Sequence, residues 1–467
     1  MRCSRPLKLA YFSPLPPMRS GIADYSRDLL PYLDPWADVH LFIDDYQPSD
    51  PGITWRFPVW SHRDFAQRDR FHSYDCPVYH LGNNPVHAYL YPYVFRRPGV
   101  IVLHDLVVHH LLAWMAFQDG RASTYLREFS YSCGSAGMTV AWEVLTGRRS
   151  PPFFDTPLCE RAVDASLGVI VHSRYIESRI RESSPDARVR VIPMPMPLGP
   201  EKADKVALRR QLGLPPTAFI VGSLGEATHH KRLEIVLRAF ARLAARRPEA
   251  VYVIAGHVAP GLDLAAQAER LGVGRRVRIT GTLSADLFAA TLGAVDVSVN
   301  LRYPTAGETS AAALRSLAAG LPTIVSDLGA NQELPGSCCF KLPLGGEEEL
   351  LLAAVLEKLA GNGALRTGLG AAGRRYIAKE HAPARAARDY ILFVEEVLNS
   401  PSALAKPRSG GHEAQASALI KEVAGRMREI GLGQENQALL EDVAEALKIL
   451  EGGMKMPRAS EPKGMEG

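Results

Sequence analysis

The chain has 467 residues, more than one hydrophobic core usually organises, which favours two domains of roughly 180 to 200 residues plus an appendage. Hydrophobic residues make up 46% and charged residues 22% of the sequence, ordinary globular values that exclude wholesale disorder and an integral membrane protein. The net charge is only +4 and the basic residues are scattered, so nothing points to a nucleic-acid partner.

The N-terminal segment and the cysteine spacing indicate the cellular compartment in which the protein acts. The apolar run at residues 7–12 is ended by Pro14, Pro16 and Pro17, so we interpret it as a first strand and not as a signal peptide. No window approaches the roughly 20 apolar residues of a spanning helix. The six cysteines show no C-x-x-C spacing, which favours a reducing environment. We therefore expect a cytoplasmic protein that acts in solution or at the inner face of a membrane.

Two series of short apolar runs rich in Val, Ile and Tyr alternate with helical patterns. Strand followed by helix, repeated, predicts an α/β class with parallel sheets whose faces are covered. We therefore expect two doubly wound, Rossmann-like domains that face each other across a cleft, with ligands at the carboxyl ends of the strands. The candidate strands are residues 9–13, 39–44, 77–82, 99–105, 168–173 and 189–195 in the first series, and 218–225, 250–256, 276–281, 295–301 and 322–327 in the second.

The domain limits follow from these two series. Residues 1–197 are expected to form the first domain and residues 198–380 the second, with a polar stretch between them. A long helical pattern at residues 381–400 is expected to cross back onto the first domain. Residues 401–467 begin with a Ser, Pro, Gly and Lys linker and form a helical tail.

The tail contains two amphipathic patterns, at residues 413–430 and 436–450, which predict a C-terminal helical extension. Their apolar faces need a partner. Docking on the body of the protein and self-association through these helices are the two hypotheses.

The first candidate site segment is the loop of residues 13–26 after the first strand. Gly21 stands at the junction with a helix, where a backbone without Cβ allows close approach of a ligand and free N–H groups favour an anion. A tight turn that simply needs glycine is the structural alternative. We interpret Gly21 as donor-binding and Asp24, in the same segment, as acceptor-binding.

Two ionisable residues, His104 and Asp105, end the fourth strand after an unbroken run of Val, Ile and Leu. We expect them to open into the cleft. His104 is a catalytic candidate because an imidazole there can donate a hydrogen bond to a substrate hydroxyl or a developing charge. Asp105 is assigned to the acceptor side, where it orients His104 or shapes the loop. A purely structural histidine is the alternative.

A cluster of four potentially cationic side chains, residues 229–232, precedes the helix that begins at Leu233. Cations at a helix N-terminus oppose the helix dipole unless an anion binds there, so the segment predicts a diphosphate clamp. Lys231 is the leading candidate and is placed in the catalytic set. Arg232 is placed in the donor-binding set.

A glycine, an acid and two hydroxyls open a helix of small residues at positions 307–310. The backbone N–H groups of Thr309 and Ser310 are expected to hold a phosphate, and Glu308 is expected to face the cleft as a catalytic candidate. Gly307 and Arg315 complete this donor-binding set. A capped helix without a ligand is the alternative.

These segments, in this order, resemble the family 4 (group 1) glycosyltransferases, whose second halves carry Glu-x7-Glu, a small-residue helix ending in Gly-x-Pro, and a strand ending near Ser-Asp. The likeness covers about residues 7–400. It is carried by residues 307–322, 324–327 with Gly329, 277–281, 169–173, 104–105 and the proline-rich first loop.

The resemblance implies the GT-B arrangement of two facing domains. It implies a nucleotide-diphosphate sugar held mainly by the second domain, a glycan or lipid-linked acceptor held mainly by the first, and transfer of a hexosyl group such as mannosyl or glucosyl. It also implies retention of the anomeric configuration, with the base gripped near Thr280 and Gly281. A peripheral membrane contact is a further hypothesis, because residues 89–97 mix aromatics with two arginines, although a partly buried helix explains them as well.

Two departures from the family pattern are specific. The second Glu of the Glu-x7-Glu element falls on Arg315 and the first on Gly307, and Glu226 stands where an arginine is usual. Arg232 or Arg315 is expected to supply the second phosphate cation.

No Asp-x-Asp pair occurs in the sequence, so we expect metal-independent chemistry in which Lys231, a second cation and a helix N-terminus neutralise the leaving diphosphate. No cofactor is expected. An NAD-dependent oxidoreductase is disfavoured because no strand is followed by G-x-G-x-x-G. A nucleotide-sugar epimerase and a catalytically inactive scaffold of the same fold remain alternatives.

Overall fold

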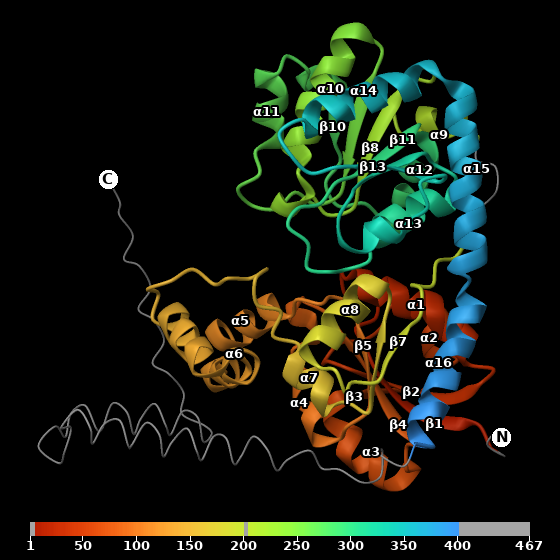
Figure 1. Ribbon diagram of the computed structural model, residues 1–467. Coiled ribbons are helices and arrows are strands. Elements are labelled where there is room, and N and C mark those ends of the chain that lie inside the picture. Colours follow the sequence, from red (N-terminus) through yellow and green to blue (C-terminus); the bar gives the residue numbers. More distant parts are fainter. Residues whose placement is uncertain (1–4, 200–203, 401–467) are drawn as a thin grey trace, which may run out of the picture.

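The computed structural model describes residues 5–199 and 204–400, which form two α/β domains stacked end to end (Figure 1). The first sheet has seven parallel strands in the order β3-β2-β1-β4-β5-β6-β7. Its strands are β1 (Leu7–Phe12), β2 (Ala37–Ile43), β3 (Val59–Ser61), β4 (Cys76–Leu81), β5 (Val100–Leu103), β6 (Gly168–Val171) and β7 (Val189–Val191).

The second sheet has six parallel strands in the order β10-β9-β8-β11-β12-β13. Its strands are β8 (Ile220–Leu224), β9 (Val251–Ala255), β10 (Val277–Ile279), β11 (Val297–Asn300), β12 (Thr323–Ser326) and β13 (Cys339–Leu342). Both sheets are buried under helices, as the continuously apolar strands predict. The expected class, two doubly wound α/β domains, is confirmed.

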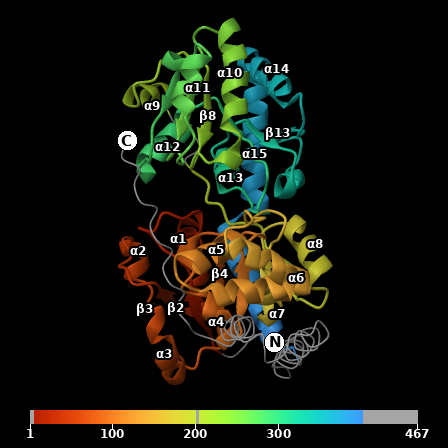
Figure 2. The same cartoon turned by 90° about the vertical axis from the view of Figure 1, so that its left-hand side faces the viewer.

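Helices cover both faces of each sheet (Figure 2). Those of the first half are α1 (Gly21–Leu33), α2 (Pro51–Thr54), α3 (Phe65–His72), α4 (Tyr91–Arg96), α5 (His109–Phe117), α6 (Ala122–Leu145), α7 (Glu160–Ala165) and α8 (Arg174–Ser183). Those that follow are α9 (Lys205–Gln211), α10 (Leu233–Arg246), α11 (Leu264–Arg270), α12 (Ala285–Ala294), α13 (Ala311–Ala318), α14 (Glu348–Gly361), α15 (Gly363–Glu380) and α16 (Pro383–Leu398).

The strand order reverses direction between β1 and β4 in the first sheet and between β8 and β11 in the second. In doubly wound sheets, ligands bind outside the carboxyl ends of the strands at this switch point. The loops after these four strands are therefore where a site is expected.

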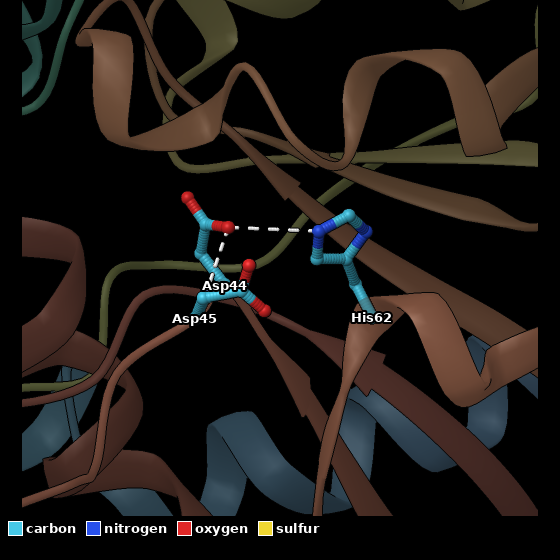
Figure 3. Close-up of side chains that lie close together, drawn as sticks. All are labelled: Asp44, Asp45 and His62. Carbon is cyan, nitrogen blue, oxygen red and sulfur yellow. Dashed lines mark hydrogen bonds and ion pairs between the residues drawn. The ribbon is translucent and has the colours of Figure 1, made fainter.

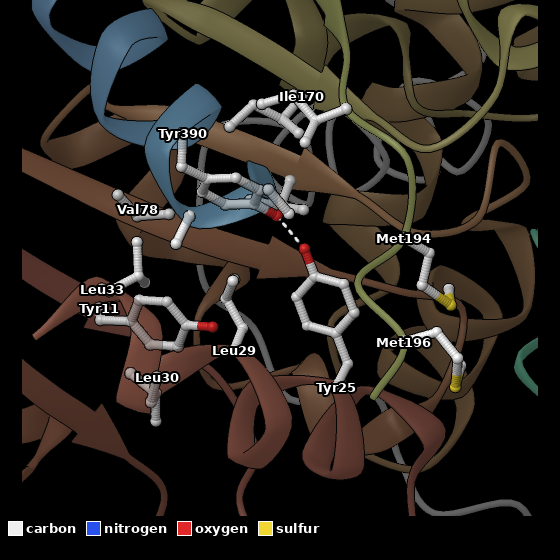
Figure 4. Packing of buried hydrophobic residues seen from close by; sticks show 14 of the residues in the cluster. Tyr11, Tyr25, Leu29, Leu30, Leu33, Val78, Ile170, Met194, Met196 and Tyr390 are labelled. Carbon is white, nitrogen blue, oxygen red and sulfur yellow. Dashed lines mark hydrogen bonds between the residues drawn. The ribbon is translucent and has the colours of Figure 1, made fainter. Parts of the chain in front are cut away.

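Helix α16 packs against α1 and β6 of the first sheet (Figure 4). The hydroxyls of Tyr390 on α16 and Tyr25 on α1 hydrogen-bond inside this core. The chain enters α16 beside the first domain, where Met196 N–H donates to His381 O (2.8 Å) and His381 Nδ1–H donates to Met194 O (2.8 Å). The last described helix is thus an integral part of the first domain's core.

The short edge strands β3 and β13 were not predicted. The aromatics of residues 89–97 do not offer a membrane surface, because Tyr89 and Tyr91 are buried and α4 is the partly buried helix of the alternative explanation. The helices expected at 413–430 and 436–450 lie outside the described residues. In the ranges 5–199 and 204–400, which the structure describes, no helix is long and apolar enough to cross a membrane.

Candidate functional site

The carboxyl-terminal edges of the two sheets face each other, because the two domains contact each other through the loops and helices that follow the strands. These contacts lie in the layer between the domains, where α1 and α13 meet (Figures 1 and 2). They join Val107 N–H to Ala306 O (2.9 Å), Arg315 to Asp24 (2.9 Å), and the N–H groups of Arg174 and Tyr175 to the Glu333 carboxylate (3.1 and 2.9 Å).

A pocket lies at the switch point of the second sheet. Its lining comes from β8, β11, the loop after β8 and the start of α10, namely Ser223, Leu224, Gly225, Lys231, Leu233, Val299, Asn300 and Leu301. Gly225 adopts φ 93°, and a Cβ there would stand 3.3 Å from Lys231 Nζ. A glycine is therefore required where the backbone passes beside the ammonium.

The Lys231 side chain has no close partner in the part of the chain that the structure describes. Lys231 ends the short 3-10 helix His229–Lys231, and among the described residues it has neither a hydrogen-bond nor an ion-pair partner. Burial, and to a lesser extent the charge of Arg302, lower its pKa from 10.5 to about 7, while Glu226 opposes the shift. A buried cation is costly unless it is paired, so this position calls for an anion.

A second cation of this region, Arg302, was not assigned from the sequence. Arg302 follows β11, and Lys231 follows β8. Because β8 and β11 are neighbouring strands at the switch point, the two side chains lie in the same region. Arg302 forms an ion pair with Glu308, with side chains 11% and 15% exposed, and its Nε is buried without a partner. Burial lowers its pKa from 12.5 to about 10, against the opposing effect of Asp105 in the first domain. Arg302 stands two residues beyond the end of β11, and only the strand order that places β11 beside β8 indicates its importance.

Arg232 is directed elsewhere. Its guanidinium pairs with Glu348 on α14, a residue that is 1% exposed, and lies over the Tyr303 ring at 5.5 Å. Arg302, and not Arg232, is therefore the cation whose charge acts on Lys231, and the expectation that Arg232 or Arg315 supplies the second phosphate cation stays a prediction. His230 is also not a cation at neutral pH, because burial, and then Arg302 and Lys231, lower its pKa to about 3.

The start of α13 supplies hydroxyls and N–H groups. Ser310 is the N-cap: its Oγ donates to Asn300 Oδ1 (2.8 Å) and accepts from Ala313 N–H (3.3 Å). Thr309 Oγ1 is buried without a partner, and no described residue accepts from the N–H groups of Thr309 and Ser310. Glu308 accepts from Thr305 Oγ1 (3.0 Å) as well as pairing with Arg302. The structure thus groups Glu308, Thr309 and Ser310 with Arg302.

The absence of a glutamate at position 307 has a steric reason. Gly307 adopts φ 85°, and a Cβ there would stand 2.6 Å from the Cβ of Leu106 in the other domain. Both the backbone conformation and the approach of the two domains therefore require glycine.

Arg315 and Asp24, assigned to the donor and the acceptor, bind each other. Arg315 on α13 donates to Asp24 Oδ2 on α1 (2.9 Å), and Arg27 holds the other oxygen of Asp24 (3.0 Å). This ion pair joins α13 of the second domain to α1 of the first. With side chains 26% and 33% exposed, it contributes little to stability by itself.

His104 does not open into the cleft; its ring is 3% exposed. His172 Nδ1–H donates to Ile192 O (2.9 Å), so His172 Nε2 accepts from His104 Nδ1–H (3.3 Å), and His104 Nε2 accepts from His80 Nδ1–H (3.0 Å). Burial holds the pKa of all three histidines below the usual value, which keeps the row neutral. The three histidines lie in or just after the neighbouring strands β4, β5 and β6, so their contact cannot be predicted from the sequence of one strand alone. The catalytic role of His104 stays a prediction, without a free ring nitrogen to support it.

The other sequence-predicted site residues lie at the domain interface, after the first strand β1 and after the edge strand β10. Asp105 lies at the interface, where it accepts from Asn83 N–H (2.7 Å); burial raises its pKa to about 6 against the effects of that bond and of Arg302. Thr280 and Gly281 follow β10, where Thr280 N–H donates to Ile254 O (3.0 Å). Gly21 is the first residue of α1, with open space where a Cβ would stand.

A separate group of metal-type ligands, Asp44, Asp45 and His62, follows β2 and β3 (Figure 3). Its members are already engaged. Asp45 accepts from Arg63 (2.7 Å) and Ser61 (3.2 Å), and His62 Nδ1 is bonded to Tyr93 (3.1 Å).

Comparison with known proteins places this geometry in context. Residues 204–336 match the family model "Glycosyl transferases group 1", and this segment holds Lys231, Arg302 and Glu308. The D-inositol 3-phosphate glycosyltransferase of Stackebrandtia nassauensis is 28% identical over 244 residues, which cover 49% of this chain and 54% of that protein. The chain thus aligns with about half the length of that curated relative.

Two solved structures show the fold. HepE of Anabaena, in complex with UDP, has a TM-score of 0.58 at 18% identity and covers 84% of this chain and 100% of its own. Sucrose-phosphate synthase of Thermosynechococcus elongatus has a TM-score of 0.62 at 16% identity and covers 84% of this chain and 99% of its own. The chain has the GT-B fold of these glycosyltransferase structures.

Proposed function

We propose that the protein is a retaining, metal-independent glycosyltransferase that moves a hexosyl group, such as glucosyl or mannosyl, from a nucleotide-diphosphate sugar to a glycan or lipid-linked acceptor. The carrying observation is the unpaired Lys231 ammonium beside Arg302 at the switch point of the second sheet. Such a pair suits a diphosphate, whose charge grows as the glycosidic bond breaks. The match of this segment to the group 1 family model supports the same reading.

The leaving group is stabilised by fixed charges of the protein. Lys231 and Arg302 neutralise the diphosphate, and the N–H groups of Thr309 and Ser310 at the start of α13 bind its oxygens. Because these groups are positioned before the reaction, they need little reorganisation as charge develops. This arrangement, together with a sequence without Asp-x-Asp, supports metal independence.

Retention is proposed through attack from the side of the leaving group, with the donor phosphate accepting the proton of the acceptor hydroxyl. Two carboxylates close to Arg302 are occupied: Glu308 pairs with Arg302, and Asp105 accepts from Asn83 N–H. Their engagement favours a route without a carboxylate nucleophile.

The test is thermal unfolding with UDP, GDP and ADP, each with and without EDTA. A ligand at 100 times its dissociation constant adds about 2.7 kcal/mol to the free energy of unfolding, so we expect one nucleotide to raise Tm by about 3 °C or more in either buffer. UDP is tried first because HepE was solved with it. The absence of a shift with all three nucleotides would favour an inactive scaffold, and loss of the shift in EDTA would contradict metal independence.

A further inference from the structure

Three exposed aromatic side chains lie where α1 and α2 end on the surface of the first domain. Tyr32 and Trp36 are each 40% exposed, and Trp55 is 88% exposed. Tyr32 is in the last turn of α1, and Trp36 follows four residues later in a turn that continues the helix, so their rings lie on the same side. Arg56, next to Trp55, donates to Asp34 (2.6 Å) and joins the end of α2 to the end of α1. We call these three rings the aromatic patch.

The core of the first domain does not need the ring of Trp55. Helix α2 is already anchored by its neighbours Ile53 and Phe57, which are 2% and 4% exposed and belong to the core that contains α1. Single exposed hydrophobic residues are common, but large aromatic rings gathered in one region mark an interaction surface. The aromatic patch is therefore available to another segment of protein.

The described chain ends at the same edge of the first domain. Helices α1 and α16 pack side by side, with the hydroxyls of Tyr25 and Tyr390 bonded between them (Figure 1). Both helices run towards the amino-terminal edge of the sheet: Trp36 directly precedes β2, and Val397 near the end of α16 contacts Gly168, the first residue of β6. The chain beyond residue 400 therefore starts close to the aromatic patch.

The nearer of the two amphipathic patterns beyond α16, residues 413–430, fits this patch in reach and in pattern. Residues 401–412 separate it from the described chain and span up to about 40 Å when extended, several times the 8–10 Å between packed helices. Its large apolar residues recur at helical spacing and share one face. They are Leu419, Ile420, Val423, Met427 and Ile430.

Charge separates this segment from the second amphipathic pattern. The aromatic patch is flanked by Asp34 and Asp38, and only Asp34 is paired with an arginine, Arg56. Residues 436–450 carry three acidic residues against one lysine, whereas residues 401–430 carry five basic residues against three acidic ones. Opposite charges favour the nearer segment beside these carboxylates, and like charges disfavour the farther one.

We propose that the apolar face of residues 413–430 binds to the aromatic patch of the same chain. The contact fastens the segment after α16 to the amino-terminal edge of the first sheet, opposite the edge that faces the second domain. Because the aromatic patch lies away from Lys231 and from the layer between the domains, this inference is independent of the proposed function.

The test is hydrogen exchange of the full-length protein, read by mass spectrometry in peptides from residues 413–430. Trp55→Ser removes the most exposed ring of the patch, and Val423→Asp places a charge in the apolar face of the segment. Trp142→Ser is the matched control, because Trp142 is an exposed tryptophan (43%) on α6. Circular dichroism establishes that each variant is folded, and sedimentation velocity at two concentrations gives the oligomeric state.

We expect residues 413–430 to exchange at least about tenfold more slowly in the wild type and in Trp142→Ser than in Trp55→Ser or Val423→Asp. The double variant should lose no further protection, and the protected protein should be a monomer. Fast exchange in the wild type, or protection that persists in Trp55→Ser, would overturn the inference. Protection that appears only with a dimer at high concentration would overturn it in favour of self-association. The Tm shift with nucleotide should be the same in Trp55→Ser as in the wild type, so the proposed function is tested separately.

Discussion

Lys231→Met is expected to bind nucleoside diphosphates at least about 100-fold more weakly than the wild type, although its ligand-free form unfolds at a higher temperature. Methionine retains most of the apolar stem but removes a buried, unpaired charge. Each pKa unit corresponds to about 1.4 kcal/mol, and burial lowers the Lys231 pKa from 10.5 to about 7, so the charge costs the ligand-free fold of the order of 1–3 kcal/mol after relaxation. Calorimetry of binding and of unfolding measures the two effects.

The same pKa predicts how binding depends on pH. In the ligand-free protein Lys231 loses its proton above about pH 7, whereas a bound diphosphate raises its pKa. Binding therefore takes up a proton above pH 7, and affinity weakens as pH rises, by up to tenfold per unit. The stability gained by Lys231→Met shrinks over the same range, because the wild-type lysine becomes neutral. The exposed Lys379→Met is the control, and affinity independent of pH would contradict the account.

A steep loss of stability in acid is the second large effect that we expect. Burial lowers the pKa of His87, His109 and His172 to about 4 and keeps that of His80 and His104 well below 6.5. The unfolded chain binds these protons near pH 6.5 but the folded chain does not. Stability is therefore complete above pH 6.5 and falls as pH decreases towards 4, by about 2 kcal/mol at pH 5 for each histidine of pKa about 4.

His87→Asn isolates one of these protons. His87 donates from Nδ1 to His80 O (2.9 Å), a bond that the asparagine amide reproduces, and its Nε2 is buried without a partner. Urea unfolding between pH 7 and 5 should show a shallower fall in the free energy of unfolding for this variant, and an unchanged fall for the exposed His257→Asn. An equally steep curve in His87→Asn would contradict the assignment.

Local pattern predicted the architecture well. Helix α10 begins at Leu233, as predicted, and the eleven candidate strands include every central strand of the two sheets. The strands β3 and β13, three and four residues long at the sheet edges, carry too few apolar residues to signal themselves. An edge position alone does not hide a strand, because the edge strands β7 and β10 were predicted from their apolar runs.

The site was harder to predict because its side chains are directed by residues far along the chain. Arg232 pairs with Glu348, 116 residues later in the chain, and His104 is hydrogen-bonded to His172, 68 residues later. Lys231 could be proposed from the sequence because a cation at a helix start has a local physical meaning. Arg302 has no such local signal, and its importance follows only from the strand order that places β11 beside β8.

The central claim is that the cations of the second domain promote departure of a nucleoside diphosphate. Its most direct test is to incubate wild type, Lys231→Met and Lys379→Met with UDP-, GDP- and ADP-hexoses in EDTA and to quantify released nucleoside diphosphate and the anomer of the sugar product. The account predicts release from one donor class with retained configuration, in wild type and Lys379→Met but not in Lys231→Met. Equal release by Lys231→Met, an inverted product, or intact donors with all three proteins would contradict it.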